Sequence, residues 1–308
     1  MPDERMDYLK KIYKPKKTSY SHIEYMLPSN ISGSSTGSGN EKGNAALNAV
    51  RACDGIIHVI KNFQLFGEPP SEPEKDFLDL ESEMILNDLL LAEKRIEKIN
   101  LELKKGRKID AEELSLLKKS VEILLENKPL RNNTGITEAP QLKGFTFLSA
   151  KPLLIICNNS DENEELPSMP RIQTDIEVMV VRGKLEMEIG EMSPEDAKEF
   201  LEDFHIEESL LDRVIRRSFE IANLISFFTV GEDEVKSWTI PKGIIALDAA
   251  DVIHSDISKG FIRAETLNYD QFVEYGTFAE AKKNGAFRLE GKEYIVRDGD
   301  IITFRFNV

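Results

Sequence analysis

Two glycine–lysine pairs are the places in this 308-residue chain where phosphate chemistry would first be sought. A loop that cradles a polyphosphate reads G-x-x-x-x-G-K-[ST]: glycine amides face the phosphates, the lysine neutralises them, and the hydroxyl holds magnesium. Here Gly183-Lys184 is followed by leucine and Gly291-Lys292 by glutamate. Neither pair completes the motif, so these residues predict no polyphosphate site of that kind.

The cysteines and histidines predict neither a metal centre nor a covalent nucleophile. Cys53 and Cys157 are the only cysteines, and each adjoins an apolar run, which indicates buried free thiols. There is no C-x-x-C pair and no Cys/His cluster, so we expect no structural zinc site. None of the four histidines stands in a recognisable motif with a nucleophile. His58 lies within an apolar run, which is typical of a hydrogen-bonded core histidine.

The composition indicates an acidic globular protein of about two domains. Its formal net charge is −15, so any contact with nucleic acid requires a local basic patch. The N-terminus has no apolar signal stretch, and no apolar run approaches the roughly 20 residues of a membrane helix. We therefore expect a cytoplasmic protein without membrane contact.

Residues 76–127 carry the clearest periodic pattern. Apolar residues recur at helical spacing on both sides of a break at Gly106, and Asp110 with Glu113 forms a capping-box signal for the second helix. The pattern predicts an antiparallel helical hairpin held by its apolar seam. Four cations cluster at the tip of this hairpin: Lys104, Lys105, Arg107 and Lys108. They could contact phosphates of RNA, or they could form an ordinary solvated turn.

Strands and helices are expected to alternate outside the hairpin, which favours an α/β sheet. The predicted buried strands are residues 55–60, 152–157 and 176–181, and a short strand-like run covers residues 22–27. From about residue 224 short strands and turns dominate, and Asp298-Gly299-Asp300 marks a tight turn. A separate β-rich domain is expected to close the chain.

The last third resembles the TGS domain that ends Obg-like ATPases, the YchF family. The matching runs, in order, are 238–243, 249–256, 259–265, 294–300 and 304–308. Residues 15–17, 23–24, 51–54 and 58–59, the hairpin, and 151–161 also resemble this family. The resemblance implies an incomplete P-loop GTPase-like α/β sheet over 1–75 and 128–223. It also implies an inserted coiled-coil hairpin at 76–127 and a C-terminal β-grasp (TGS) domain at 224–308.

Three departures from the family pattern lead us to expect no hydrolysis of ATP or GTP. In the family, the phosphate-binding loop precedes all the segments that this sequence matches. Its D-x-x-G motif, which supports magnesium and meets the terminal phosphate, is replaced by Leu27-Pro28-Ser29-Asn30. Pro28 moreover lacks an amide donor. The family's catalysis-linked histidine has no counterpart in residues 64–75.

A base-recognition motif is half retained according to the same resemblance. The family's N-x-x-E, associated with adenine, reads here as Asn158-Asn159-Ser160-Asp161. Asp161 resembles the guanine-reading aspartate of other GTPases, since a carboxylate can accept hydrogen bonds from N1 and N2 of guanine. The alternative is a surface Asn and Asp that close the end of a strand. The loop that usually backs the base is Ser-Ala in the family and Arg182-Gly183 here.

Two functions from different classes remain open at this stage. The first is a non-catalytic relative of Obg-like ATPases that binds the ribosome, RNA or a protein in translation, with no cofactor and no metal. The second is a GTP- or ATP-binding protein that binds nucleotide weakly through Asn158 and Asp161. Because the family's first strand is central in its sheet, we also expect a rearranged sheet or a homodimer.

Overall fold

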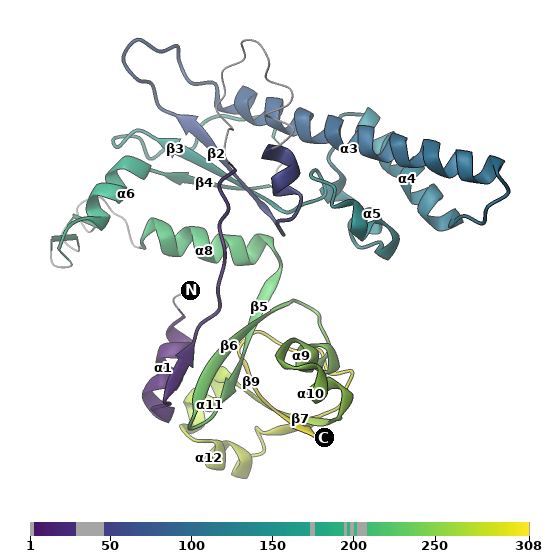
Figure 1. Cartoon of the computed structure of the whole chain (residues 1–308). Helices are drawn as coiled ribbons and strands as arrows, with labels where there is room; N and C mark the ends of the chain where they lie inside the picture. The colour runs from purple at the N-terminus through teal and green to yellow at the C-terminus, as the bar shows by residue number, and fades with distance from the viewer. Residues whose placement is uncertain are drawn as a thin grey trace. The chain divides into compact units, whose positions relative to one another are not determined.

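The computed structural model describes residues 3–28, 46–172, 176–193, 196–197, 200–201 and 208–307. The chain divides into two compact units (Figure 1). Met1–Glu24 and Leu211–Val308 form the first, which we call the β-grasp unit, and Tyr25–Leu210 forms the second, the hairpin unit. Among the described residues, no helix is both long and apolar enough to span a membrane.

The β-grasp unit is built on one six-stranded sheet in the order β1-β6-β5-β9-β7-β8. Its strands are β1 (Lys17–Ser19), β5 (Leu224–Val230), β6 (Glu234–Pro241), β7 (Phe261–Asn268), β8 (Arg288–Glu290) and β9 (Asp300–Phe306). The closing strand β9 runs parallel to β5 and antiparallel to β7, so it lies inside the sheet. This arrangement agrees with the predicted C-terminal β-grasp domain.

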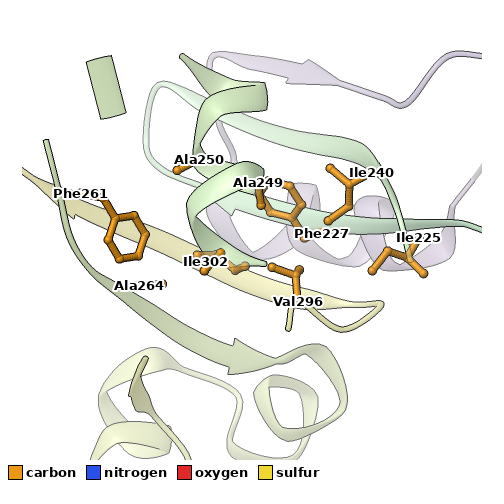
Figure 2. Close-up of a cluster of buried hydrophobic side chains, with 10 residues drawn as sticks. Ile225, Phe227, Ile240, Ala249, Ala250, Phe261, Ala264, Val296 and Ile302 are labelled. Carbon is orange, nitrogen blue, oxygen red and sulfur yellow. The ribbon is translucent and has the colours of Figure 1, made fainter. Parts of the chain in front are cut away.

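Apolar side chains cover both faces of this sheet. On one face, α9 (Ala246–Ile253) packs its alanines against Phe227, Ile240 and Ile302 (Figure 2). On the other face, Phe228 and Ile301 pack under α1 (Glu4–Tyr13), α11 (Tyr269–Tyr275) and α12 (Phe278–Lys283). Alternate residues of β5 and β9 thus serve opposite cores, as the two-residue period of a strand requires. The short helix α10 (Ser255–Lys259) and α8 (Leu210–Ile221) complete the helices described here.

The N-terminal segment joins the β-grasp unit, which differs from the predicted domain division. Residues 1–24 were expected in the GTPase-like part, yet Met6 and Leu9 of α1 are fully buried against the β-grasp core. Strand β1 pairs in parallel with β6, and Arg5 forms an ion pair with Asp298 at 2.7 Å. Apolar burial on a distant partner decides this placement, and a lysine-rich local sequence gives no signal of it.

The strand expected at residues 22–27 is absent from the structure. These residues are extended without assignment to a strand, and Tyr25, Met26 and Leu27 leave much of their side chains exposed. A strand depends on pairing and on packing against neighbours more than on its own alternation. The short strand instead forms at β1, where β6 offers a pairing edge.

The hairpin unit contains a three-stranded parallel sheet in the order β2-β3-β4. The strands are β2 (Ile56–Asn62), β3 (Leu153–Asn159) and β4 (Glu177–Val181). In the central strand, Leu153 to Cys157 are all buried, as expected for a parallel strand covered on both faces. The expected α/β sheet with an inserted hairpin is therefore confirmed.

The hairpin consists of α3 (Pro73–Lys104) and α4 (Ala111–Leu125), which pack along one apolar seam (Figure 1). Asp110 caps α4 by accepting hydrogen bonds from the amides of Glu112 and Glu113. The expected reciprocal bond from Glu113 does not form. Its carboxylate instead takes both ends of the Arg95 guanidinium, at 2.6 and 2.8 Å, and so joins the two helices. The smaller helices of this unit are η1 (Leu130–Asn132), α5 (Thr134–Thr137), η2 (Pro140–Phe145) and α6 (Gly183–Gly190).

Candidate functional site

Amide side chains lie close together at the carboxyl edge of the parallel sheet. The Nδ2 of Asn62, at the end of β2, donates to Oδ1 of Asn159, at the end of β3, at 2.7 Å. Asn159 in turn donates to the carbonyls of Asn163 and Glu165 and so orders the loop after β3. In open α/β sheets, ligands bind outside the carboxyl ends of the strands. This edge is therefore where a nucleotide base would be sought.

Asn158 and Asp161, predicted from sequence to read a base, lie together at the N-terminus of α6. Oδ1 of Asn158 accepts from the Gly183 amide at 3.0 Å, and Oδ1 of Asp161 accepts from the Leu185 amide at 3.2 Å. The Lys184 ammonium stands 3.9 Å from the other Asp161 oxygen. These contacts satisfy amides that the first turn of a helix leaves without partners. Both residues therefore hold the helix in place, although the carboxylate retains free lone pairs for a further donor.

A side chain at Gly183 would displace the side chain of Asn158 from its present position. A Cβ at this position would lie 2.9 Å from Oδ1 of Asn158, inside the distance that real Cβ contacts show. The glycine that fails the phosphate-loop pattern thus has a local role, because it lets α6 begin against the end of β3. Arg182, just before it, reaches Glu164 in the loop after β3 at 2.7 Å.

The segment that replaces the family's magnesium-supporting motif lies partly outside the described residues. Leu27 and Pro28 are described, and the Leu27 side chain is 91% exposed. Ser29 and Asn30 are not described. Neither Leu27 nor Pro28 offers a side-chain ligand for magnesium, because that ion takes oxygen ligands.

The tip of the hairpin is a glycine-terminated helix end. Gly106 adopts a φ of +69°, and its amide donates to the carbonyl of Leu103. The next amide, that of Arg107, reaches back to the carbonyl of Glu102 at 3.1 Å. These two bonds form a Schellman motif, which stops α3 and turns the chain toward Asp110.

All four predicted tip cations are exposed in this turn. Lys104 is the last residue of α3, Lys105 is its cap, and Arg107 and Lys108 follow the glycine. None of the four forms an ion pair with any residue that the structure describes. Cations near a helix C-terminus also interact favourably with its dipole, so part of this cluster has a local structural reason. The cluster remains a patch of like charge on an acidic protein.

A fully buried carboxylate fixes the hairpin to the sheet. Asp88, in the middle of α3, accepts from the amides of Leu148 at 3.0 Å and Ser149 at 2.7 Å. It also accepts from the Arg51 guanidinium at 3.0 Å, and Arg51 donates to the Thr146 carbonyl as well. Charge-assisted hydrogen bonds of this kind are stronger than neutral ones and strongly directional. They set the position of α3 relative to the start of β3.

A second buried ion pair involves Glu81, which lies two turns before Asp88 on the same buried face of α3. Glu81 forms an ion pair with Arg131 of η1, whose guanidinium also donates to the Lys151 carbonyl at 3.1 Å. The buried roles of Glu81 and Asp88 were not predicted from the sequence, because a lone Asp or Glu on a helix is ordinarily solvated. One available signal is the spacing: Glu81 and Asp88 share the buried stripe with Ile85 and Ala92.

His58 is half-buried beside the core, which differs from the expected core position, and it is not fully hydrogen-bonded. Its ring stacks on Phe77 of α3 with centroids 6.0 Å apart. Its Nδ1 atom has no hydrogen-bond partner among the described residues. Burial lowers the pKa of His58 to about 4, so the ring is neutral at pH 7.

Comparison with known proteins identifies relatives along the whole chain. Residues 224–307 match the family model YchF-GTPase_C, described as a protein of unknown function (DUF933). The chain is 38% identical to the ribosome-binding ATPase YchF of Pasteurella multocida, with 100% of this chain and 88% of that protein covered. It is 37% identical to the ribosome-binding ATPase YchF of Bacillus subtilis, with the same coverage.

Solved structures agree with this similarity. The YchF GTPase of Schizosaccharomyces pombe superposes with a TM-score of 0.81 at 29% identity, over 99% of this chain and 86% of that one. A GTP-binding protein from Pyrococcus horikoshii superposes with a TM-score of 0.56 over 84% and 80% of the two chains. At 19% identity, the second likeness shows the fold alone. The chain therefore belongs to the YchF family.

Proposed function

We propose that this protein is a ribosome-binding translation factor that contacts RNA through the tip of its helical hairpin and does not hydrolyse ATP or GTP. Its relatives in Pasteurella multocida and Bacillus subtilis are named ribosome-binding ATPases. The observation that carries the proposal is the exposed cation cluster at the tip, formed by Lys104, Lys105, Arg107 and Lys108. Such a cluster supplies the local positive charge that an acidic protein needs to approach a phosphate backbone.

The architecture of the hairpin supports this use of the tip. The 32-residue helix α3 holds the cluster away from the sheet, and Arg95–Glu113 ties α3 to α4 along the shaft. At the base, Asp88 and Glu81 fix α3 by directional bonds. A charged tip on a braced shaft loses less conformational entropy on binding than the same residues on a free loop would.

The proposed loss of hydrolysis rests on residues inside the chain. Phosphoryl transfer depends on positioned charge and hydrogen-bond donors around the phosphates and magnesium. The run Leu27-Pro28-Ser29-Asn30 supplies neither the carboxylate nor the glycine amide of the family motif. Residues 64–75 contain no histidine.

Weak nucleotide binding is the second candidate function. Its support is the placement of Asn158 and Asp161 at the carboxyl edge of the sheet, beside the N-terminus of α6. Against it, each side chain already accepts a backbone amide. Binding would therefore have to use the remaining lone pairs of Asp161.

Ribosome co-sedimentation tests the first proposal. The variant Lys104→Glu/Lys105→Glu/Arg107→Glu/Lys108→Glu should lose at least about tenfold in apparent affinity at low salt, because each reversal removes a cation and adds an anion. A matched control reverses four exposed lysines of the hairpin shaft: Lys94, Lys98, Lys118 and Lys119. It makes the same change in net charge and should pellet nearly as the parent protein does. Equal losses of ribosome affinity in both variants would contradict the proposed role of the hairpin tip.

Calorimetric titration with ATP, GTP and their diphosphates in the presence of magnesium tests the remaining points. We expect no heat of nucleotide binding and no phosphate released from ATP or GTP. Binding of a guanine nucleotide that Asp161→Ala abolishes would favour the second function instead. Measurable phosphate release would overturn the proposed loss of hydrolysis while leaving the co-sedimentation result intact.

A further inference from the structure

The β-grasp unit contains a hollow of about 380 Å³ that no function discussed so far uses. Its floor is one end of the sheet. Val230 on β5, Thr303 on β9 and Glu265 on β7 lie side by side there, as the strand registers require. Its volume falls in the range of roughly 300–1,000 Å³ that is typical of ligand pockets.

Aromatic rings form the walls of this hollow. Tyr13 from the end of α1 meets Phe278 of α12 edge-on, with ring centroids 6.2 Å apart. Phe278 in turn meets Phe287 at 6.0 Å. Burial raises the pKa of Tyr13 to about 12, so its hydroxyl stays protonated near neutral pH and can donate a hydrogen bond. Aromatic walls of this kind offer stacking surfaces to a flat ring.

Among the described residues, a single lysine lines the hollow. This is Lys282, which stands 6.0 Å from the Phe287 ring centroid. Lys10, Lys11 and Lys14 flank Tyr13 in the sequence but do not line the hollow. None of these four lysines forms an ion pair with a residue in the described part of the chain. On a protein of net charge −15, Lys282 is a local attraction for anions.

The one carboxylate among the described residues that line the hollow is already paired. Glu265, on the floor, forms an ion pair with Arg305 of β9. Glu280 of α12 lies 3.8 Å from the Lys283 ammonium. A cationic ligand would therefore meet the unpaired Lys282 ammonium and no free carboxylate among the described residues that line the hollow. The charge favours a ligand that joins an aromatic ring to a phosphate.

We propose that this hollow, the aromatic pocket, binds one unstacked nucleotide of single-stranded RNA. The Phe278 and Phe287 rings are nearly perpendicular, at 77°, so the base would stack on the face of one ring and meet the other edge-on. The Thr303 hydroxyl would be a polar partner within the pocket. The flanking phosphate would lie at Lys282. Aromatic stacking inside a positively charged groove is the general means of holding single strands, and a duplex cannot offer an unstacked base. The proposal adds a second contact with RNA, in a different unit from the hairpin tip.

Fluorescence anisotropy with a labelled, unstructured 12-nucleotide RNA and the full chain tests this site. Ala279→Glu places a carboxylate in the pocket wall, at a first-turn position of α12 where the helix dipole favours it. Phe287→Leu keeps apolar volume and removes a stacking ring. Each should weaken binding about fivefold or more. Lys282→Glu should also reduce the slope of log K against log salt by about 0.7, as loss of one single-strand phosphate contact predicts.

The controls separate this inference from the proposed function. Lys242→Glu makes the same charge change as Lys282→Glu at an exposed position outside the pocket, and its affinity should stay within about twofold. A 12-base-pair RNA duplex should bind at least about tenfold more weakly than the single strand. Equal binding of duplex and single strand, or wild-type affinity in all three pocket variants, would overturn the aromatic pocket. If only the tip variant loses oligonucleotide binding, the pocket is refuted and the hairpin-tip proposal stands.

Discussion

Both units pack helices on their sheets through apolar contacts, but the hairpin unit adds buried charged hydrogen bonds to its longest helix. In the β-grasp unit, Phe227 and Phe228 are fully buried on opposite faces of the sheet, and the helices pack on them through apolar contacts. In the hairpin unit, α3 is fixed through Asp88 and Glu81, which bond to arginines and to backbone amides. Apolar burial is non-directional, whereas charged hydrogen bonds specify one orientation. Directional bonds occur where a long helix must present its far end at a defined place.

A single tryptophan makes this comparison measurable. Trp238, the only tryptophan, lies on β6 and stacks on Phe227 with ring centroids 6.4 Å apart. Its fluorescence therefore reports on the β-grasp unit alone. Far-UV circular dichroism is weighted toward helix and reports on the helices of both units, among which α3 and α4 are the longest described. Urea unfolding followed by both signals compares the units in one sample.

The largest effect is expected from Phe227→Ala. Removing a fully buried aromatic ring leaves a cavity, and the cost is about 3–5 kcal/mol of unfolding free energy. The Trp238 transition and the helical signal of the β-grasp unit should move to lower urea, while the helical signal of α3 and α4 stays in place. Leu289→Ala, on the exposed side of β8, is the matched control and should change stability by about 0.5 kcal/mol or less. If the whole helical signal shifts with the Trp238 signal in Phe227→Ala, the units unfold as one and the comparison fails.

Asp88→Ala should give the converse result. It leaves the amides of Leu148 and Ser149 and the guanidinium of Arg51 without their buried acceptor, at a cost of about 3 kcal/mol. The helical transition should move and the Trp238 transition should not. Glu93→Ala removes an exposed carboxylate from the same helix and should be nearly neutral. A neutral Asp88→Ala would show that apolar packing alone holds the hairpin.

These two variants also mark the limits of sequence reasoning. Helical periodicity located the hairpin and its tip, because apolar spacing and a glycine break are local signals. It did not find Asp88, whose partners Leu148 and Ser149 lie about 60 residues away along the chain. In the β-grasp unit, turn residues and family motifs placed the domain from residue 224 onward. They did not place α1, whose burial of Met6 and Leu9 is a long-range event.

The predicted base-recognition residues illustrate the same division. The apolar run before Asn158 and Asp161 correctly predicted that both residues lie at the end of a buried strand. It could not show that their oxygens hold the first turn of α6, because those partners lie about 25 residues further along the chain. The aromatic pocket was invisible for the same reason, since Tyr13 and Phe287 come from opposite ends of the chain.

The free energy of unfolding measured against pH distinguishes the hairpin unit from the β-grasp unit in a further way. The pKa of His58 is lowered by burial from 6.5 to about 4 in the folded protein. Between these values the unfolded chain binds the extra proton, so the stability that His58 contributes is lost as pH falls from about 6.5 to 4, and this contribution is constant outside that window. The loss approaches about 3 kcal/mol. His58→Leu should remove this loss from the helical transition and leave the Trp238 transition unchanged. An equal pH dependence in both proteins would mean that His58 is not held neutral.

The smallest effect is expected from Asp110→Ala at the hairpin tip. Asp110 accepts the amides of Glu112 and Glu113, and loss of such a cap costs about 1 kcal/mol, visible in the helical transition only. The same change removes an exposed negative charge beside Lys108. If the tip binds RNA through charge, ribosome co-sedimentation should be unchanged or slightly stronger although the hairpin is less stable. Weaker co-sedimentation, approaching that of the fourfold Glu variant, would instead mean that the shape of the turn matters more than its charge.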